Sequence, residues 1–214
     1  LRVSLPMLKD SWGEDFVPID QFPRSFCVMT GRSPNSFKPY TPIDVSKDYL
    51  DLLVKGYKTG KVSSSLFESK EGDRIVLKGP REKLNVKVLE NVDRIVAFAG
   101  GTGITPIYQV LKYLKESRRI IEFRLFYANK SQEDILLKEE LDRLIEEMPG
   151  FRIINVIEAE RGYVNESDVK ELDQFKDYVL VCGPKGFNDL LLGNKESGQI
   201  GLLSKFPNER KYKF

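Results

Sequence analysis

The sequence predicts a two-part fold, in which a small antiparallel β-barrel precedes a doubly wound α/β domain built on a parallel sheet. Up to about residue 90, short strand-like runs are separated by turn-forming residues, which is typical of a small barrel. Beyond that point, apolar runs alternate with amphipathic helical runs, which indicates a parallel sheet covered by helices. We therefore expect domains 1–88 and 89–214.

Each predicted element follows from its own pattern of apolar residues and neighbouring turn formers. In the first domain the expected strands are Phe26–Thr30, Leu50–Lys55 and Arg74–Lys78. In the second domain the expected strands are Arg94–Ala99, Ile120–Tyr127, Arg152–Ile157 and Tyr178–Cys182, and the expected helices are 106–116 and 132–147.

The composition excludes several classes of function. A net charge of +2 over 214 residues gives no reason to expect a nucleic-acid partner. The chain has no histidine, which removes Ser-His triads and histidine metal sites, so we expect no metal. Two cysteines, Cys27 and Cys182, are too few for a disulfide framework and fit a reducing compartment. No apolar run spans a membrane, and because the chain starts at Leu1, we expect that an anchor or targeting segment can lie outside it.

The strongest motif is Gly100–Pro106, which follows the apolar run 94–99 directly and opens a helical run. Its three glycines allow backbone amides to approach a ligand, and a helix N-terminus binds a pyrophosphate. Thr105 is a suitable helix N-cap, and Pro106 suits the first helical position. The spacing is close to the dinucleotide fingerprint G-x-G-x-x-G, with Pro106 in place of the last glycine. A plain tight turn is the alternative interpretation.

Two weaker motifs lie in the first domain. In Lys38–Asp44, the ring of Tyr40, the hydroxyl of Thr41 and the charge of Lys38 suit a flat aromatic ligand that carries a phosphate. The alternative is a proline-bracketed turn with an aromatic plug. The segment Gly60–Leu66 combines a glycine, hydroxyls and the start of a short helix, and it predicts either a second anion site or an ordinary cap.

A fourth signal is Cys182-Gly183-Pro184 at the end of the last predicted strand. Ligands of open α/β sheets bind beyond the carboxyl ends of the strands, so a cysteine there would face the ligand. A buried, unreactive cysteine is the alternative.

Taken in order, these motifs resemble the flavin reductases of the ferredoxin–NADP reductase superfamily, and within it the NADH–cytochrome b5 reductases. The resemblance covers nearly the whole chain from about residue 26, and the C-terminal segment is similar to the mitochondrial subgroup. The matching stretches are Lys38–Ile43, Leu53–Lys55, Gly60–Ser63, Gly72-Asp73, Lys78–Pro80, Gly100–Pro106, Tyr127–Asn129, Glu133–Leu137, Cys182–Pro184, Gly193–Lys195 and Tyr212–Phe214.

The resemblance implies two cofactors, FAD and NADH, and a role for each matching residue. Thr41, Lys55 and Cys182 would be the catalytic residues, with Tyr40 stacked on the isoalloxazine and Cys182 beside the nicotinamide. Glu158 would accept hydrogen bonds from the adenosine ribose and repel a 2′-phosphate, favouring NADH. The cofactor-binding set is Lys38, Pro39, Tyr40, Thr41, Val54, Lys55, Tyr57, Gly60, Lys61, Val62, Ser63, Gly100, Gly101, Thr102, Gly103, Thr105, Pro106, Glu158, Cys182, Gly183, Pro184, Phe187 and Phe214.

Three departures from the family pattern are present. Lys38 stands where the family usually has arginine, so a bidentate pyrophosphate contact becomes a point-charge contact. Lys185 replaces a second proline, and Phe187 stands where methionine is usual. Between Glu158 and Gly162 only residues 159–161 remain, where the family usually has a longer loop containing tryptophan.

The implied reaction is hydride transfer from NADH to FAD, followed by single-electron transfer to a haem protein such as cytochrome b5. Lysines at positions 55, 58, 61, 83 and 87 would attract an acidic haem protein if they share a face, and otherwise form a solvated surface. The alternatives are a related reductase with a nitrate-reductase-type or ferredoxin-like partner or with NADPH, and a non-catalytic nucleotide-binding module. We expect a monomer, in the mitochondrial outer membrane or intermembrane space, or at the cytosolic side of the endoplasmic reticulum.

Overall fold

The chain divides into two compact units, Leu1–Asn85 and Val86–Phe214, and each is described by itself. The computed structural model describes residues 2–4, 24–30, 38–45, 49–56, 59–73 and 75–214. The boundary that we expected after residue 88 falls inside the 3-10 turn Val86–Leu89, which opens the second unit.

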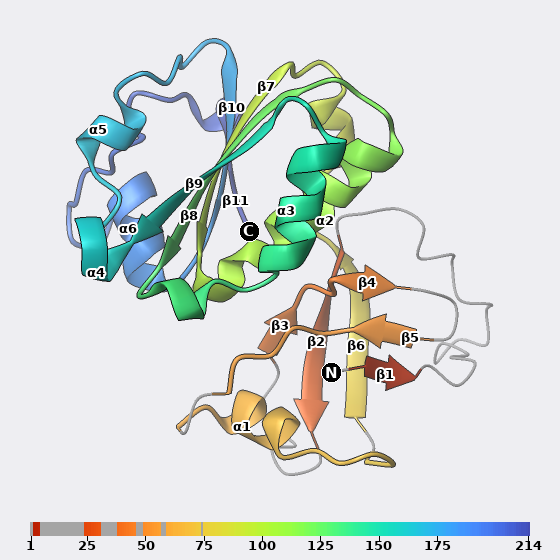
Figure 1. The fold of residues 1–214 in the computed structure, drawn as a ribbon. Coiled ribbons are helices and arrows are strands. Elements are labelled where there is room, and N and C mark those ends of the chain that lie inside the picture. The colour runs from red at the N-terminus through yellow and green to blue at the C-terminus, as the bar shows by residue number, and fades with distance from the viewer. Residues whose placement is uncertain (1, 5–23, 31–37, 46–48, 57–58, 74) are drawn as a thin grey trace. The chain divides into compact units, whose positions relative to one another are not determined.

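The described part of the first unit consists of two three-stranded antiparallel sheets and a short helix (Figure 1). One sheet has the order β1-β5-β4, and the other has the order β3-β2-β6. This arrangement agrees with the expected antiparallel barrel. Its elements are β1 (Arg2–Ser4), β2 (Arg24–Thr30), β3 (Lys38–Tyr40), β4 (Asp44–Val45), β5 (Tyr49–Asp51), α1 (Lys61–Phe67) and β6 (Ile75–Glu82).

The core of this unit joins β5 to α1. Leu50 and Leu52 alternate along the chain and are buried together with Val62 and Leu66, which lie four residues apart on one face of α1. The strand expected over 50–55 ends at Asp51, because its pairing with β1 and β4 ends there, although Leu52 stays in the core.

The second unit is a five-stranded, fully parallel sheet with the order β11-β10-β7-β8-β9. Helices alternate with strands along the chain, as the sequence predicts. The strands are β7 (Arg94–Gly100), β8 (Glu122–Asn129), β9 (Phe151–Ile157), β10 (Asp177–Cys182) and β11 (Lys211–Lys213). The helices are α2 (Ile104–Glu116), α3 (Lys138–Glu147), α4 (Glu158–Arg161), α5 (Glu166–Val169) and α6 (Lys185–Leu192).

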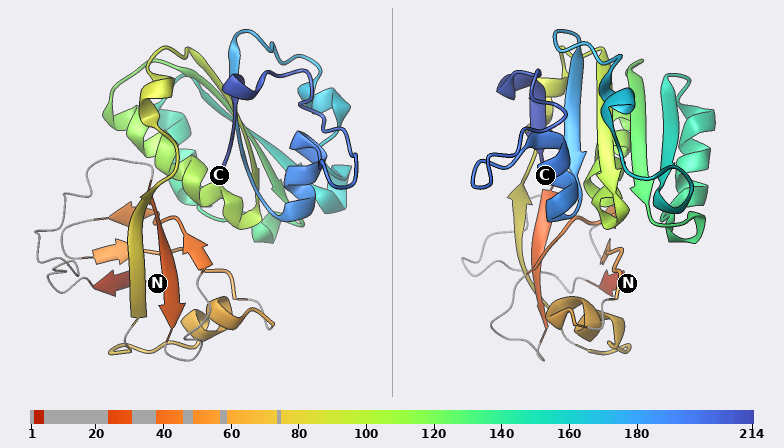
Figure 2. Two further views of the ribbon diagram at one scale, coloured as in Figure 1. Left: turned by 180° about the vertical axis from the view of Figure 1, so that it is seen from behind. Right: turned by 90° about the vertical axis from the view of Figure 1, so that its left-hand side faces the viewer.

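Helices cover both faces of this sheet, which makes it a doubly wound fold. Helices α2 and α3 lie on one face, and α4, α5 and α6 lie on the other (Figures 1 and 2). The central strands are apolar on both sides for this reason: residues 95–100 of β7 are all buried. Phe98 and Phe126 stack with ring centroids 4.9 Å apart in the core beneath α5 and α6.

Two predicted helices differ from the structure. The helix expected over 106–116 begins at Ile104, because the 3-10 turn Gly101–Gly103 leads directly into it. The helix expected over 132–147 is broken: a 3-10 turn covers Gln132–Asp134, and α3 begins at Lys138. Leu137 adopts a left-handed conformation with φ 57° between them, which a continuous helix does not allow.

Candidate functional site

The carboxyl ends of the parallel strands bring three of the predicted segments to one edge of the second unit. The turn Gly101–Gly103 follows β7, α4 begins with Glu158 directly after β9, and Gly183 follows β10. Strand β7 pairs with both β8 and β10, so the glycine turn that follows it lies at the middle of this edge. Ligands of open α/β sheets bind at this edge.

The glycines of the motif have different surroundings. Gly101 has φ 52°, and a Cβ atom added to it would meet nothing within 4 Å, so its surface is open to a ligand. Gly103 is buried, and a Cβ there would lie 2.1 Å from the carbonyl oxygen of Cys182. The side-chain position of Gly103 is therefore filled by the backbone at the end of β10, and the approach of a ligand to the Gly103 backbone stays a prediction. Gly100 is also buried, facing Pro184 and Phe187.

No side-chain hydrogen bond caps the start of α2, and the amide of its first residue, Ile104, donates to the Gly101 carbonyl of the preceding 3-10 turn. The N-cap of α2 is Gly103, and the first turn of the helix has no acidic residue. The predicted N-cap, Thr105, is instead inside the helix and buried, and its hydroxyl donates to the Thr102 carbonyl at 3.2 Å. Pro106 is the third helical residue, where its missing N–H is still tolerated. The helix start fits an anionic ligand.

Tyr127 contacts the glycine motif from the neighbouring strand, β8. It is fully buried, and its hydroxyl donates to the Gly101 carbonyl at 3.3 Å and accepts the Leu136 N–H at 3.2 Å. Burial raises the pKa of Tyr127 to about 12, against the opposing effect of the hydrogen bond with the Leu136 backbone. The sequence assigned no role to Tyr127 beyond its place in the Tyr127–Asn129 motif.

The segment after β10 gathers the other predicted residues of this unit. Cys182 is half-buried at the end of the strand. Phe187 packs against Gly183, because a Cβ added to Gly183 would lie 2.4 Å from the Phe187 ring. Phe214 donates its N–H to the Val181 carbonyl at 3.0 Å, so the chain terminus lies beside the same strand end. The exposed Pro184 is the N-cap of α6.

Glu158 is exposed at the start of α4, at the end of β9. Tyr163, itself 67% exposed, donates its hydroxyl to Glu158 Oε1 at 2.8 Å, and this hydrogen bond raises the pKa of Tyr163. Residues 158–161 form one turn of helix, α4, which ends at Gly162 with φ 77°. Arg161 forms an ion pair with Asp168 of α5 at 2.5 Å. The shortened segment that the sequence indicated is thus a compact, internally bonded turn.

In the first unit, the start of α1 is the candidate phosphate site. Gly60 is its N-cap, without a side-chain cap, and the first turn contains no acidic residue. Lys61 is exposed, and the buried Ser63 directs its hydroxyl to the Gly60 carbonyl at 3.4 Å. Val62 is a core residue, so only its backbone is available to a ligand. These uncapped amides and the adjacent lysine fit the pyrophosphate of FAD.

The remaining predicted residues of this unit lie on β3 and after β5. Tyr40 is half-buried and packs partly against the Leu50 core, as does Val54. Thr41 and Lys55 are half-buried, and Pro39 is exposed on β3. The backbone of Lys38 pairs with β2, but its side chain lies outside what the structure describes, as do Tyr57 and Lys58.

Comparison with known proteins identifies both units. Residues 24–86 match the oxidoreductase FAD-binding domain, and residues 98–191 match the oxidoreductase NAD-binding domain. The chain is 35% identical over 207 residues to NADH-cytochrome b5 reductase 2-A of Vanderwaltozyma polyspora, covering 87% of this chain and 70% of that protein. The chain belongs to the NADH–cytochrome b5 reductase family. It is thus a flavoprotein oxidoreductase whose cofactors are FAD and NADH, as the sequence predicted.

A second relative and a solved structure agree with this family membership. NADH-cytochrome b5 reductase 1 of Dictyostelium discoideum is 35% identical over 210 residues, covering 92% of this chain and 71% of that protein. The cytochrome b5 reductase domain of Ulva prolifera nitrate reductase has a TM-score of 0.74 and 25% identity, with 89% of this chain and 84% of that chain covered. Among the described residues of our chain, no helix has the length and apolar character needed to cross a bilayer.

Proposed function

We propose that this chain transfers the hydride of NADH to FAD and passes electrons one at a time to a haem protein of the cytochrome b5 type. The observation that carries the proposal is the carboxyl edge of the parallel sheet. There an open glycine turn, a half-buried cysteine and an exposed carboxylate occupy the ends of three strands of a family member. Two of its relatives bear the name NADH-cytochrome b5 reductase, which supports this acceptor.

FAD, when bound, supplies the hydride acceptor and the single-electron donor. In the first unit, the amides at residues 61–63 and the charge of Lys61 would hold its pyrophosphate. Tyr40 and Thr41, which follow one another at the end of β3, would contact the isoalloxazine ring. Lys38, Lys55 and Tyr57 are proposed for the same site.

In the second unit, Gly101 and the amides of the 3-10 turn Gly101–Gly103, which leads into α2, would receive the NADH pyrophosphate. Glu158 would accept hydrogen bonds from the adenosine ribose, and its charge would repel a 2′-phosphate. Cys182, with Phe187 and Phe214 around the same strand end, would position the nicotinamide for hydride transfer. A placement error of about 1 Å at a reacting centre costs on the order of 100-fold in rate.

The acceptor is tested by kinetics with purified proteins. We expect a yellow protein that releases FAD in a near 1:1 ratio on denaturation, bleaches with NADH in the absence of oxygen, and then reduces cytochrome b5. NADPH and a ferredoxin serve as the comparison substrates. Faster reduction of ferredoxin than of cytochrome b5 would assign a different acceptor. A colourless protein that FAD does not reconstitute would instead be a nucleotide-binding module.

Exposed lysines are proposed to attract the acceptor. Lys61 and Lys83 are exposed in the first unit, and Lys87 is exposed in the second, which supports electrostatic attraction of an acidic haem protein by the charges of each unit. If these charges steer the partner, the bimolecular rate with cytochrome b5 falls steeply as salt is added, while the reduction of ferricyanide by NADH changes less.

We also propose a monomer in the mitochondrial outer membrane or intermembrane space, or at the endoplasmic reticulum. The similarity of Gly193–Lys195 and Tyr212–Phe214 to the mitochondrial subgroup supports the first of these compartments. Gel filtration of the holoenzyme and cell fractionation test the two statements separately.

A further inference from the structure

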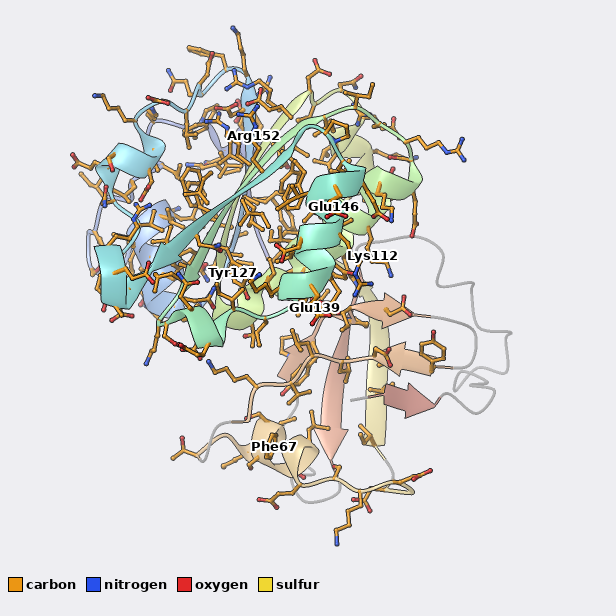
Figure 3. The ribbon with its side chains drawn as sticks, viewed as in Figure 1. Phe67, Lys112, Tyr127, Glu139, Glu146 and Arg152 are labelled. Carbon is orange, nitrogen blue, oxygen red and sulfur yellow. The ribbon has the colours of Figure 1, made fainter. Side chains whose placement is uncertain are left out.

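The hydroxyl of Tyr127 joins two turns that follow adjacent strands. It donates to the Gly101 carbonyl of the turn after β7, at 3.3 Å, and accepts the Leu136 N–H of the segment after β8, at 3.2 Å. A second carbonyl, that of Leu136, lies farther away at 3.5 Å. A phenol has one proton to donate, so the shorter contact directs it to Gly101. Figure 3 shows the Tyr127 side chain near the end of β8.

The Gly101 carbonyl fixes the direction of the next amide. In a trans peptide the C=O and the following N–H point in opposite directions. The Gly101 carbonyl faces the Tyr127 hydroxyl and also accepts the Ile104 N–H at the start of α2. The N–H of Thr102 therefore points away from the Tyr127 hydroxyl. A Cβ on Gly101 would meet nothing within 4 Å, so there is open space beside this turn.

We propose that Tyr127 is a positioning residue for the NADH pyrophosphate, whose hydroxyl holds the Gly101–Thr102 peptide so that the Thr102 amide faces the ligand. Gly101 needs this support because its φ of 52° is one of several conformations open to a glycine. A phenol is protonated at physiological pH and can donate this hydrogen bond, and burial raises the pKa of Tyr127 from 10.0 to about 12, which extends the protonated range to higher pH.

The same contact explains the break before α3. The Leu136 N–H donates to the phenol, and the next residue, Leu137, adopts the left-handed conformation at the N-cap of α3. Tyr127 thus couples the glycine turn to the segment Ile135–Leu137. The proposal rests on the assignment of the glycine turn to the NADH pyrophosphate made above.

The test removes only the hydroxyl. The full-length, FAD-loaded Tyr127→Phe variant is titrated with ADP, which carries the pyrophosphate but no nicotinamide, and its NADH kinetics are measured with ferricyanide. We expect the Kd for ADP and the KM for NADH to rise about three- to tenfold, the scale of one neutral hydrogen bond, with kcat near that of the parent. A merely structural role would lower stability without this KM-against-kcat separation.

The matched control is Tyr178→Phe, which removes a phenol hydroxyl from a buried position at the opposite, amino-terminal end of β10. This control should bind ADP as the parent does. The proposal is overturned if Tyr127→Phe binds ADP as tightly as the parent, if Tyr178→Phe weakens binding equally, or if only kcat falls.

Amide hydrogen exchange of the parent provides a measurement that needs no variant, should Tyr127→Phe fail to fold. ADP should slow exchange of the Thr102 amide; an unchanged rate in a protein that binds ADP would overturn the positioning role alone. A parent that binds no ADP would overturn the nucleotide site itself, and with it this inference.

Discussion

Replacing Gly103 by alanine tests the close approach between the glycine turn and the end of β10. A Cβ at this position would lie 2.1 Å from the Cys182 carbonyl oxygen, 2.6 Å from its carbon and 3.0 Å from the Gly183 nitrogen. These are backbone atoms, which cannot rotate away as a flexible side chain would. The backbone of Gly103, at φ −62° and ψ −8°, is itself allowed for alanine, so the clash is the only source of strain.

The expected cost follows from that geometry. The strand end and the turn must separate by roughly 1 Å, and overpacking of this kind typically destabilises a protein by about 1–3 kcal/mol. The displaced residue is Cys182, which we propose positions the nicotinamide. We therefore expect the rate of flavin reduction by NADH to fall by up to about 100-fold, the cost of a 1 Å misplacement at a reacting centre.

The assay compares urea unfolding midpoints and anaerobic rapid-mixing kinetics of the FAD-loaded proteins. Gly186→Ala is the matched control: a Cβ there meets nothing within 4 Å, and the residue lies inside α6. It should raise stability by about 0.5–1 kcal/mol and leave the flavin-reduction rate unchanged. If Gly103→Ala matches the parent in both stability and reduction rate, the packing argument is refuted.

Three further predictions concern single residues. Glu158→Thr should narrow the NADH-to-NADPH ratio of kcat/KM by about tenfold, roughly the 1.4 kcal/mol scale of one polar contact, and an unchanged ratio would mean that another residue recognises the ribose. Arg118 is exposed after the end of α2 and has φ 52°. The substitution Arg118→Gly should raise the free energy of unfolding in urea by about 0.5–1 kcal/mol, because glycine adopts that conformation without strain. The pKa of Tyr127 is raised from 10.0 to about 12, so its contribution to stability is complete below pH 10 and is lost as pH rises through 12. Between those values the urea midpoint of the parent should fall more steeply than that of Tyr127→Phe; parallel slopes would contradict the raised pKa.

Several features of this protein could be predicted from the sequence because they depend on residues close together in the chain. The apolar run 94–99 followed by glycines and an amphipathic helix indicated a strand–turn–helix unit, and the structure has β7, a 3-10 turn and α2 in that order. The alternation of strands and helices predicted the parallel sheet for the same reason. Side chains repeat their direction every 2 residues in a strand and every 3.6 residues in a helix, so each element can be recognised from its own short segment. The order of the motifs indicated the family and its two cofactors.

The start of α2 and the break before α3 show where local pattern was insufficient. Thr105 and Pro106 are each suited to a helix start, yet the helix begins at Ile104 because the preceding glycine turn is already helical in form. The apolar spacing over 132–147 fits one continuous helix. The Leu136 N–H bonds instead to a phenol from β8, which no pattern within the segment contains.

Only the tertiary structure shows that the glycines of the motif have different surroundings. In the sequence, Gly101 and Gly103 are equivalent members of one motif. In the fold, Gly101 faces open space with its carbonyl held by Tyr127, whereas Gly103 lies against the carbonyl of Cys182, far away in the chain. The physical reason is that a position requires glycine either because its backbone has a positive φ or because neighbouring atoms leave no room for a Cβ. A sequence motif can indicate the first requirement, but the second depends on which strands the fold brings together.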